Sequence, residues 1–340
     1  MKKQQYAIIF FFLFITLGLS TYSYLGNFDS ANVAANPSAQ APSNDGMDES
    51  YFKIIDYYLL NESKPFLQLE STHLTLSDEN TFVVALNPDG VIYRRNEKNV
   101  EEEPVYFKAL SSKIYTTRKE LFLNDNVEVK LGSADLKANK ISIFNNGSHL
   151  EANGAVRTHS VDLKTNDQIL INSDFAIYRP KEQFFEYKNH VKGTVQRRRQ
   201  YEESVSFTTD LLTLAALQSK VEMKGNVTFK KGNLAASSNL GTVFLENYNK
   251  RLKYYSLSDD VRLQETLSIN GKPMVRKAFA EKLEGIISEQ KIILTGLPKV
   301  FQERDVIKGN RITIREKIET VEVDDANTNI TLEREKNESL

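Results

Sequence analysis

The chain has 340 residues, which is enough for one or two domains with a buried core. Its 44 basic and 45 acidic residues nearly cancel, so the overall charge gives no reason to expect nucleic-acid binding. Cysteine is absent, which excludes disulfide bonds, thiolate nucleophiles, thiolate metal ligands and a lipoprotein anchor. The sequence also lacks a nucleophile elbow, a Walker A loop, a dinucleotide fingerprint and an HExxH motif. We therefore predict no catalytic residue, no metal site and no cofactor.

The first apolar segment, residues 6–25, follows Lys2 and Lys3. Twenty residues of helix are about 30 Å long, enough to span a bilayer. The best candidate cleavage site ends at Ala35, ten residues past Leu25, so we favour an uncleaved anchor over a cleaved signal peptide. The lysines would keep residues 1–5 in the cytoplasm and place the rest of the chain outside.

Residues 26–50 are rich in Asn, Ala, Ser, Pro and Asp and read as a flexible linker, because such a composition cannot bury a core. The regions 51–160 and 166–335 are both rich in predicted strands. A polar, turn-like break at residues 162–168 separates them.

A nine-residue pattern occurs six times in the strand-rich part of the chain, with starts 29 to 37 residues apart. In one copy, Val221, Met223, Val227 and Phe229 surround Gly225. Of the 24 non-central positions in the six copies, 22 are apolar, whereas the interleaved positions are largely charged. Alternation with a period of two predicts an antiparallel sheet with one buried face and one solvent-exposed face.

The central residue of every copy is Asp, Gly or Asn: Asp125, Gly154, Asn189, Gly225, Asp259 and Gly296. These residue types tolerate left-handed or bulged backbone, so we predict that each strand bends at its middle without losing register. A single hairpin is marginally stable in water, so the repeats are expected to stack and to fold as one body. An ordinary β-sandwich or adhesin scaffold would show the same pattern.

The C-terminal part of the chain resembles a known family. Residues 294–302, 305–314 and 319–323 closely resemble the end of the periplasmic lipopolysaccharide-transport bridge family (LptA, or OstA-like), with its Gly-x-Pro turn, Gly-x-x-Ile strand and closing Val-Glu-Val strand. Residues 223–229 resemble the internal Gly-Asn-Val repeat of the same family. The resemblance implies an LptA/OstA-like β-jellyroll over residues 166–335.

The N-terminal part of the chain resembles the membrane-anchored sister family, LptC. The resemblance rests on the single anchor and on residues 66–70, 86–90 and 121–129. It implies an LptC-like β-jellyroll over residues 51–165, fused to the module that follows.

Together these resemblances imply an all-β fold of twisted, open β-jellyrolls whose apolar interior forms a groove. In such a groove, the acyl chains of lipopolysaccharide would slide inside while the charged sugar stays outside. The implied partners are an inner-membrane ABC lipopolysaccharide exporter and an outer-membrane lipopolysaccharide translocon, joined end to end by β-augmentation. The implied location is the inner membrane, crossed once, with most of the chain in the periplasm.

The repeat and the resemblance select twelve candidate lipid-binding residues. They are Leu123, Val127, Val129, Phe185, Val191, Met223, Val227, Phe229, Leu257, Val261, Ile292 and Leu294. Each could line a lipid groove or belong to a sealed core. The alternative function is a membrane-tethered interaction scaffold that binds no lipid. A carbohydrate-active enzyme would need inward-facing carboxylates, which the pattern does not supply.

The densest basic cluster consists of Lys192, Arg197, Arg198 and Arg199. We interpret it as a solvated strand end or loop; the competing interpretation is contact with an anionic headgroup or partner.

Overall fold

The computed structural model describes residues 50–61, 63–77, 81–95, 100–162, 166–199, 203–246, 251–269, 272–303, 305–316, 318 and 321–324. The predicted anchor at residues 6–25 lies outside these ranges, and so does the predicted linker before residue 50. Within the described ranges, no helix is long and apolar enough to cross a membrane.

The described residues form 21 β-strands in one sheet and contain no α-helix, which confirms the all-β prediction. The strands are β1 (Ser50–Asn61), β2 (Lys64–Leu76), β3 (Phe82–Leu86), β4 (Asp89–Arg95), β5 (Glu101–Lys108), β6 (Ser111–Tyr115), β7 (Glu120–Leu131), β8 (Ala134–Phe144), β9 (His149–Val161), β10 (Gln168–Arg179), β11 (Phe184–Gln196), β12 (Val205–Ala215), β13 (Lys220–Lys231), β14 (Leu234–Leu245), β15 (Leu252–Ile269), β16 (Lys272–Ile286), β17 (Lys291–Thr295), β18 (Lys299–Gln302), β19 (Asp305–Lys308), β20 (Arg311–Arg315) and β21 (Val321–Asp324). Short 3₁₀ turns are η1 (Asn145–Gly147), η2 (Ala216–Gln218) and η3 (Ile287–Glu289).

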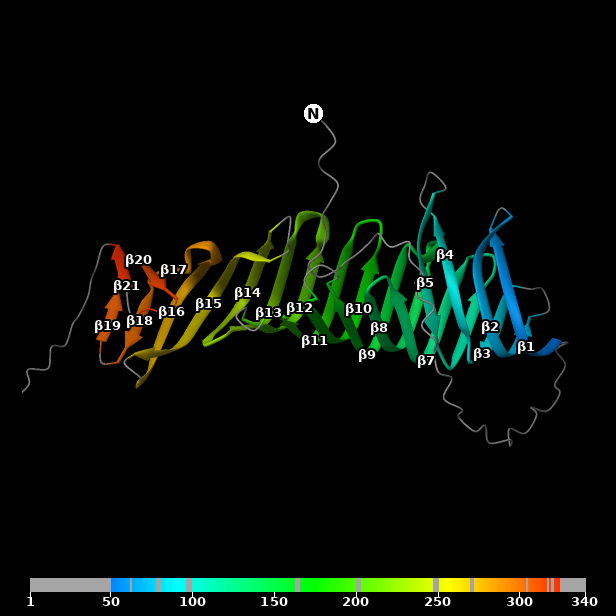
Figure 1. Cartoon of the computed structure of the whole chain (residues 1–340), viewed down its shortest axis with the longest axis horizontal. Helices are drawn as coiled ribbons and strands as arrows, with labels where there is room; N and C mark the ends of the chain where they lie inside the picture. Colours follow the sequence, from blue (N-terminus) through cyan, green and yellow to red (C-terminus); the bar gives the residue numbers. More distant parts are fainter. Residues whose placement is uncertain are drawn as a thin grey trace, which may run out of the picture.

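The strands stack along one long axis, with β1 at one end and β19 and β21 at the other (Figure 1). From β7 to β16, each strand pairs antiparallel with the next strand in the chain. Towards each end a long strand pairs with two shorter ones: β3 and β4 share β2, whereas β17 and β18 share β16. The structure thus has the stacked antiparallel strands expected of a β-jellyroll.

The centre of each repeat is a sharp corner. All six central residues have a positive φ, between 61° and 79°, and the residue after each also has a positive φ, between 47° and 54°. In β13, Lys224 and Val227 pair with Leu240 and Ser238 of β14, so two residues of β13 face one of β14. The expectation that register is kept is therefore wrong, because a bulge shifts it by one residue. The inward face is nevertheless kept, since the side chains before and after the corner are both buried.

Hydroxyl groups stabilise these corners from the partner strands. Thr209 Oγ1 donates to the backbone oxygens of Leu211 and Lys224, at 3.1 and 2.9 Å. Ser173 and Ser238 each donate to the backbone oxygen two residues further on, at 3.0 and 2.8 Å. A bulge removes regular ladder partners, and these short side chains supply donors to carbonyl groups there.

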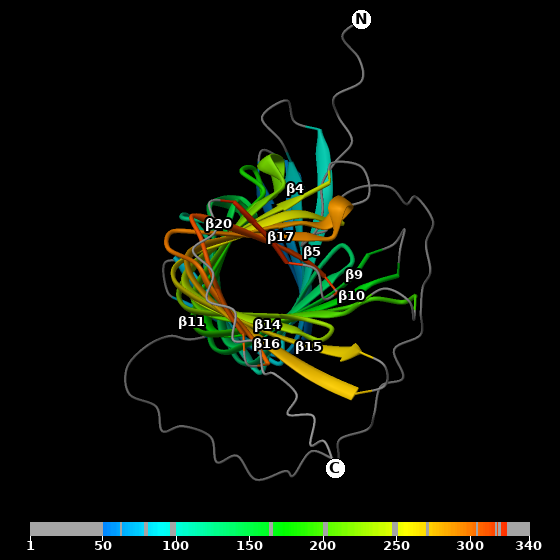
Figure 2. The same ribbon diagram turned by 90° about the vertical axis from the view of Figure 1, so that its left-hand side faces the viewer.

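The corners divide the sheet into two arms. We call the strand halves that hold residues 220–224 of β13, together with the halves of other strands that continue the same ladder, the first arm. The halves that continue from residues 227–231 of β13 are the second arm. Viewed along the long axis, the strands curve around a common centre (Figure 2). Phe229 of the second arm stacks on Tyr255 of the first arm, with ring centroids 4.9 Å apart. The two arms therefore face each other across one continuous hydrophobic core.

The sheet continues past the polar break at residues 162–168. Strand β9 pairs with β10 from Val161 and Gln168 to Leu150 and Tyr178. The division of the chain into two modules at residue 165 stays a prediction.

Candidate functional site

All twelve predicted groove residues point inward and are buried. Those of the first arm are Leu123, Phe185, Met223, Leu257, Ile292 and Leu294. Those of the second arm are Val127, Val129, Val191, Val227, Phe229 and Val261. Because the repeat places two apolar side chains on either side of each corner, the pattern creates an apolar interior along the whole stack.

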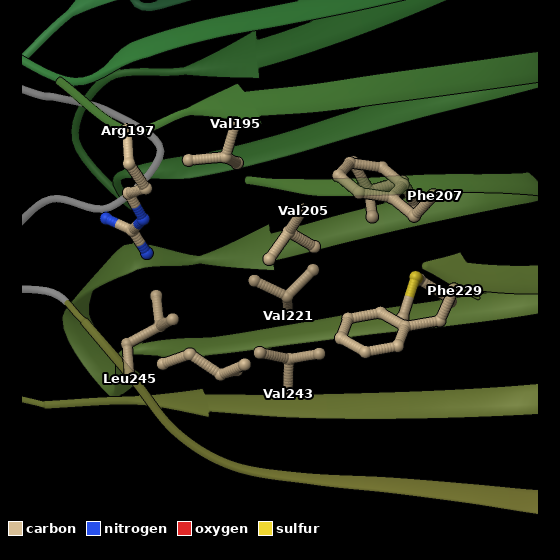
Figure 3. Close-up of a pocket in the computed structure, with 11 residues that line it drawn as sticks. Val195, Arg197, Val205, Phe207, Val221, Phe229, Val243 and Leu245 are labelled. Carbon is tan, nitrogen blue, oxygen red and sulfur yellow. The ribbon is translucent and has the colours of Figure 1, made fainter. Parts of the chain in front are cut away.

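A cavity that is open on one side lies between the arms at β11–β15. Its lining consists of Val195, Arg197, Val205, Phe207, Leu212, Val221, Met223, Phe229, Val243, Leu245 and Leu252. Arg197 and Leu245 lie at one end and Phe207 and Phe229 towards the other (Figure 3). Val205, Val243 and Leu252 are partly exposed, so the cavity opens where the strands end.

Two of the twelve predicted residues, Met223 and Phe229, line this cavity, and the others lie elsewhere in the core. The nine-residue pattern runs only along alternate strands, so it missed the contributions of β12 and β14, such as Phe207 and Val243. One signal was available in the sequence. Gly193 and Thr158 are the two non-apolar residues among the outer positions of the pattern, and the structure gives each a specific neighbour.

Glycines make room for aromatic side chains in the interior. A β-carbon at Gly193 would lie 2.0 Å from Cζ of Phe207, its cross-strand partner. A β-carbon at Gly285 would lie 2.1 Å from the ring of Tyr255, also a cross-strand partner. The large rings therefore occupy the space over these glycines, and this placement determines the shape of the interior at β11–β16.

Arg197 is a buried cation at the open side of the cavity. Its Nη1 donates to Asp167 Oδ2 at 2.7 Å, and the two side chains are 9% and 8% exposed. The backbone N–H of Arg198 donates to the other oxygen of Asp167 at 3.0 Å. The interpretation of this cluster as a solvated strand end is therefore wrong for Arg197. A counterion 30 residues earlier in the chain, which lies beside it only after folding, explains its burial.

One row of cross-strand partners follows the ends of the second arm. It comprises Ile92, Val105, Leu131, Ala134, Ser160, Ile169, Val195, Val205, Lys231, Leu234, Glu265, Arg276 and Gln302. From Ile92 to Val205 the row is apolar apart from Ser160, whereas from Lys231 onwards only Leu234 is apolar. This row therefore changes from apolar to mostly polar at β13, beside the cavity.

The interior tyrosines carry no charge at neutral pH. Burial raises the pKa of Tyr187 to about 12, although a hydrogen bond to Thr158 at 3.3 Å acts in the opposite direction. Burial also raises the pKa of Tyr178 to about 12. In the part of the chain that the structure describes, no three His, Cys, Asp or Glu residues are placed to hold a metal ion. The arrangement is suited to holding apolar groups.

Comparison with known proteins gives a family match over most of the strand-rich region. A sequence model of the family described as "LptA/(LptD N-terminal domain) LPS transport protein" matches residues 107–206 and 207–320. Among solved structures, LptH of Pseudomonas aeruginosa, described as the LptA homologous periplasmic component of the lipopolysaccharide transport device, is 18% identical, with a TM-score of 0.33. That alignment covers 38% of this chain and 89% of LptH. No curated protein matches significantly.

Proposed function

Because this chain belongs to the LptA/(LptD N-terminal domain) family of lipopolysaccharide transport proteins, we propose that its interior is a groove for the acyl chains of lipopolysaccharide. The family is not enzymatic, and the role of the chain is in lipopolysaccharide transport across the periplasm. The finer proposal concerns where the lipid binds, and it rests on the open, apolar cavity between the two arms.

The physical argument is that an apolar groove can hold a lipid without specific bonds. Burying acyl chains is favourable by about 0.8 kcal/mol per methylene group. The core is continuous from Phe66 to Ile314, so it offers neighbouring sites of similar chemistry along the stack. A lipid can then move from site to site, with the energy supplied by a partner. The charged sugar would remain at the open side, where the strands end.

The ends of the sheet suit the proposed partners. Among the described strands, β1 pairs only with β2, and β21 only with β20, so each end presents an unpaired edge. Such edges can add a strand from another sheet. We assign the β1 end to the inner-membrane ABC exporter, because the proposed anchor precedes it, and the β21 end to the bridge towards the outer-membrane translocon. Location in the inner membrane, with one crossing and most of the chain in the periplasm, is part of this proposal.

The proposed domain organisation keeps an LptC-like module at residues 51–165 and an LptA/OstA-like module at residues 166–335. The family matches begin at residue 107 and meet at residues 206 and 207. Both proposed modules therefore contain sequence of the matched family.

Lipid analysis of the purified chain tests the proposal. Wild-type protein should retain lipopolysaccharide through gentle purification. Val243→Trp, on the cavity wall, should lower the retained amount several-fold because its larger side chain fills the cavity. Phe244→Trp, the next residue of β14 and an exposed one, should retain as much lipid as wild type. Absence of lipid from all three proteins would favour the alternative, an interaction scaffold.

A further inference from the structure

A buried polar network lies between the two arms. It includes members of the row of cross-strand partners described above, from Lys231 onwards. Lys231 Nζ lies 2.7 Å from Glu316 Oε2, and Arg276 Nη1 lies 3.1 Å from Glu265 Oε2. Arg276 Nη2 also donates to the backbone oxygen of Ile318 at 2.8 Å. Glu316 and Ile318 follow β20, which belongs to the first arm, whereas the other three residues lie in the second. The network therefore spans the interior at the C-terminal side of the cavity.

Two buried polar atoms beside this network have no hydrogen-bond partner among the described residues: the hydroxyl of Tyr255 and Oε1 of Glu316. Tyr255 is fully buried and Glu316 is 6% exposed. Burial raises the pKa of Tyr255, and the charges of Glu316 and Glu265 raise it further. Buried polar atoms are nearly always paired, so an unpaired phenol donor and an unpaired carboxylate acceptor leave hydrogen-bonding capacity for a bound polar group.

Tyr255 lies directly behind one residue of the cavity wall. Phe229 forms part of the cavity wall and stacks on Tyr255 with ring centroids 4.9 Å apart. The ring of Tyr255 lies over Gly285, so its position is fixed from both sides. Lys231, two residues after Phe229 in β13, contacts Glu316, so the cavity wall connects both residues to the groove.

We propose that Tyr255 and Glu316 form a hydrogen-bonding subsite for a neutral hydroxyl or amide group on an amphiphile whose apolar chain lies in the groove. The phenol O–H donates to the ligand group, and Oε1 of Glu316 accepts a hydrogen bond from it. Hydroxyl and amide groups can do both, whereas a carboxylate has no hydrogen to donate to Oε1 of Glu316. This inference rests on the proposed function, and it adds chemical specificity to a groove that otherwise selects only apolar chains.

Matched fatty acids test the subsite directly. The probes are octadecanoic acid and a series of hydroxyoctadecanoic acids that differ in the position of the hydroxyl group, each competed against a fluorescent fatty acid. At least one hydroxylated isomer should bind wild-type protein about three- to tenfold more tightly than octadecanoic acid, the gain expected from one or two hydrogen bonds. Tyr255→Phe should abolish that preference without changing the affinity for octadecanoic acid.

The control is Tyr254→Phe, which removes the hydroxyl of the neighbouring tyrosine that bonds Glu284 at 2.6 Å, and it should keep the preference. Glu316→Gln should weaken the preference too and serves as the second variant if Tyr255→Phe fails to fold. Equal binding of all isomers to wild type would mean that the site holds only water and would overturn the inference. A preference for a hydroxylated isomer that survives in both Tyr255→Phe and Glu316→Gln would also overturn the inference. Failure of octadecanoic acid itself to bind would instead contradict the proposed groove.

Discussion

Phe207 lies directly over Gly193 on the neighbouring strand, so closely that a β-carbon on the glycine would be 2.0 Å from Cζ of the ring. Phe207 is also part of the cavity wall. The glycine therefore supplies the space in which the aromatic ring lies, and the pair determines the shape of the cavity at β11 and β12.

Gly193→Ala should displace the ring and lower the free energy of unfolding by about 1 to 3 kcal/mol, the usual cost of overpacking a core. Combining it with Phe207→Leu should cost less than the sum of the two single changes, because the smaller side chain removes the clash. Urea denaturation of the four proteins measures this coupling. Strict additivity would show that the two residues do not compete for the same space.

The ion pair of Arg197 and Asp167 should contribute strongly to stability. Arg197→Met leaves the carboxylate of Asp167 buried without its cation, and we expect a loss of about 3 to 5 kcal/mol in the free energy of unfolding. Arg262→Met is the control, because its partner Asp260 and Arg262 itself are both 63% exposed, and it should cost less than about 1 kcal/mol. Similar losses for the two variants would argue against the burial of Arg197.

Ala155 should be replaceable by glycine with a gain in stability. It occupies the second position of a corner with φ at +50°, a conformation that costs a residue with a β-carbon about 1 kcal/mol. Ala155→Gly should therefore raise the free energy of unfolding by up to about 1 kcal/mol. Ala152→Gly in the same strand, at a buried position, should lower it. Thermal unfolding shows whether each variant is more or less stable than wild type. A loss of stability in Ala155→Gly would contradict the corner geometry.

Stability should fall at alkaline pH. The folded pKa of Tyr187 is raised to about 12 from the ordinary value of 10.0, so its contribution is complete below pH 10 and is lost as the pH rises towards 12. One such tyrosine changes the free energy of unfolding by about 1.4 kcal/mol per pH unit in that window. Tyr187→Phe should show a shallower decline between pH 10 and 12, measured by urea denaturation. An unchanged slope would mean that Tyr187 is not the group responsible.

The corners were predictable from the sequence because they depend on local backbone preference. Asp125, Asn189 and Asp259 all adopt the left-handed conformation that their residue types tolerate. The inward face was predictable for the same reason, since alternation along one strand decides which side chains are buried.

The cavity and the polar network were not predictable, because both depend on which strands become neighbours. Asp167 reaches Arg197 across 30 residues of chain, and Glu316 reaches Lys231 across 85. The pairing register of many successive strands decides these contacts, and each corner shifts that register by one residue. A pattern within one strand therefore does not predict which distant residues come into contact.

Site-specific photo-crosslinking tests most directly whether the acyl chains lie inside the sheet. p-Benzoylphenylalanine replaces an aromatic ring at Phe207 or Phe229, which face the cavity, and Thr208 or Thr228, the adjacent residues of the same strands, provide outward controls. The proposed groove predicts a lipopolysaccharide adduct at Phe207 and Phe229 and none at the two threonines. Equal labelling of both faces, or adducts only at Thr208 and Thr228, would contradict it.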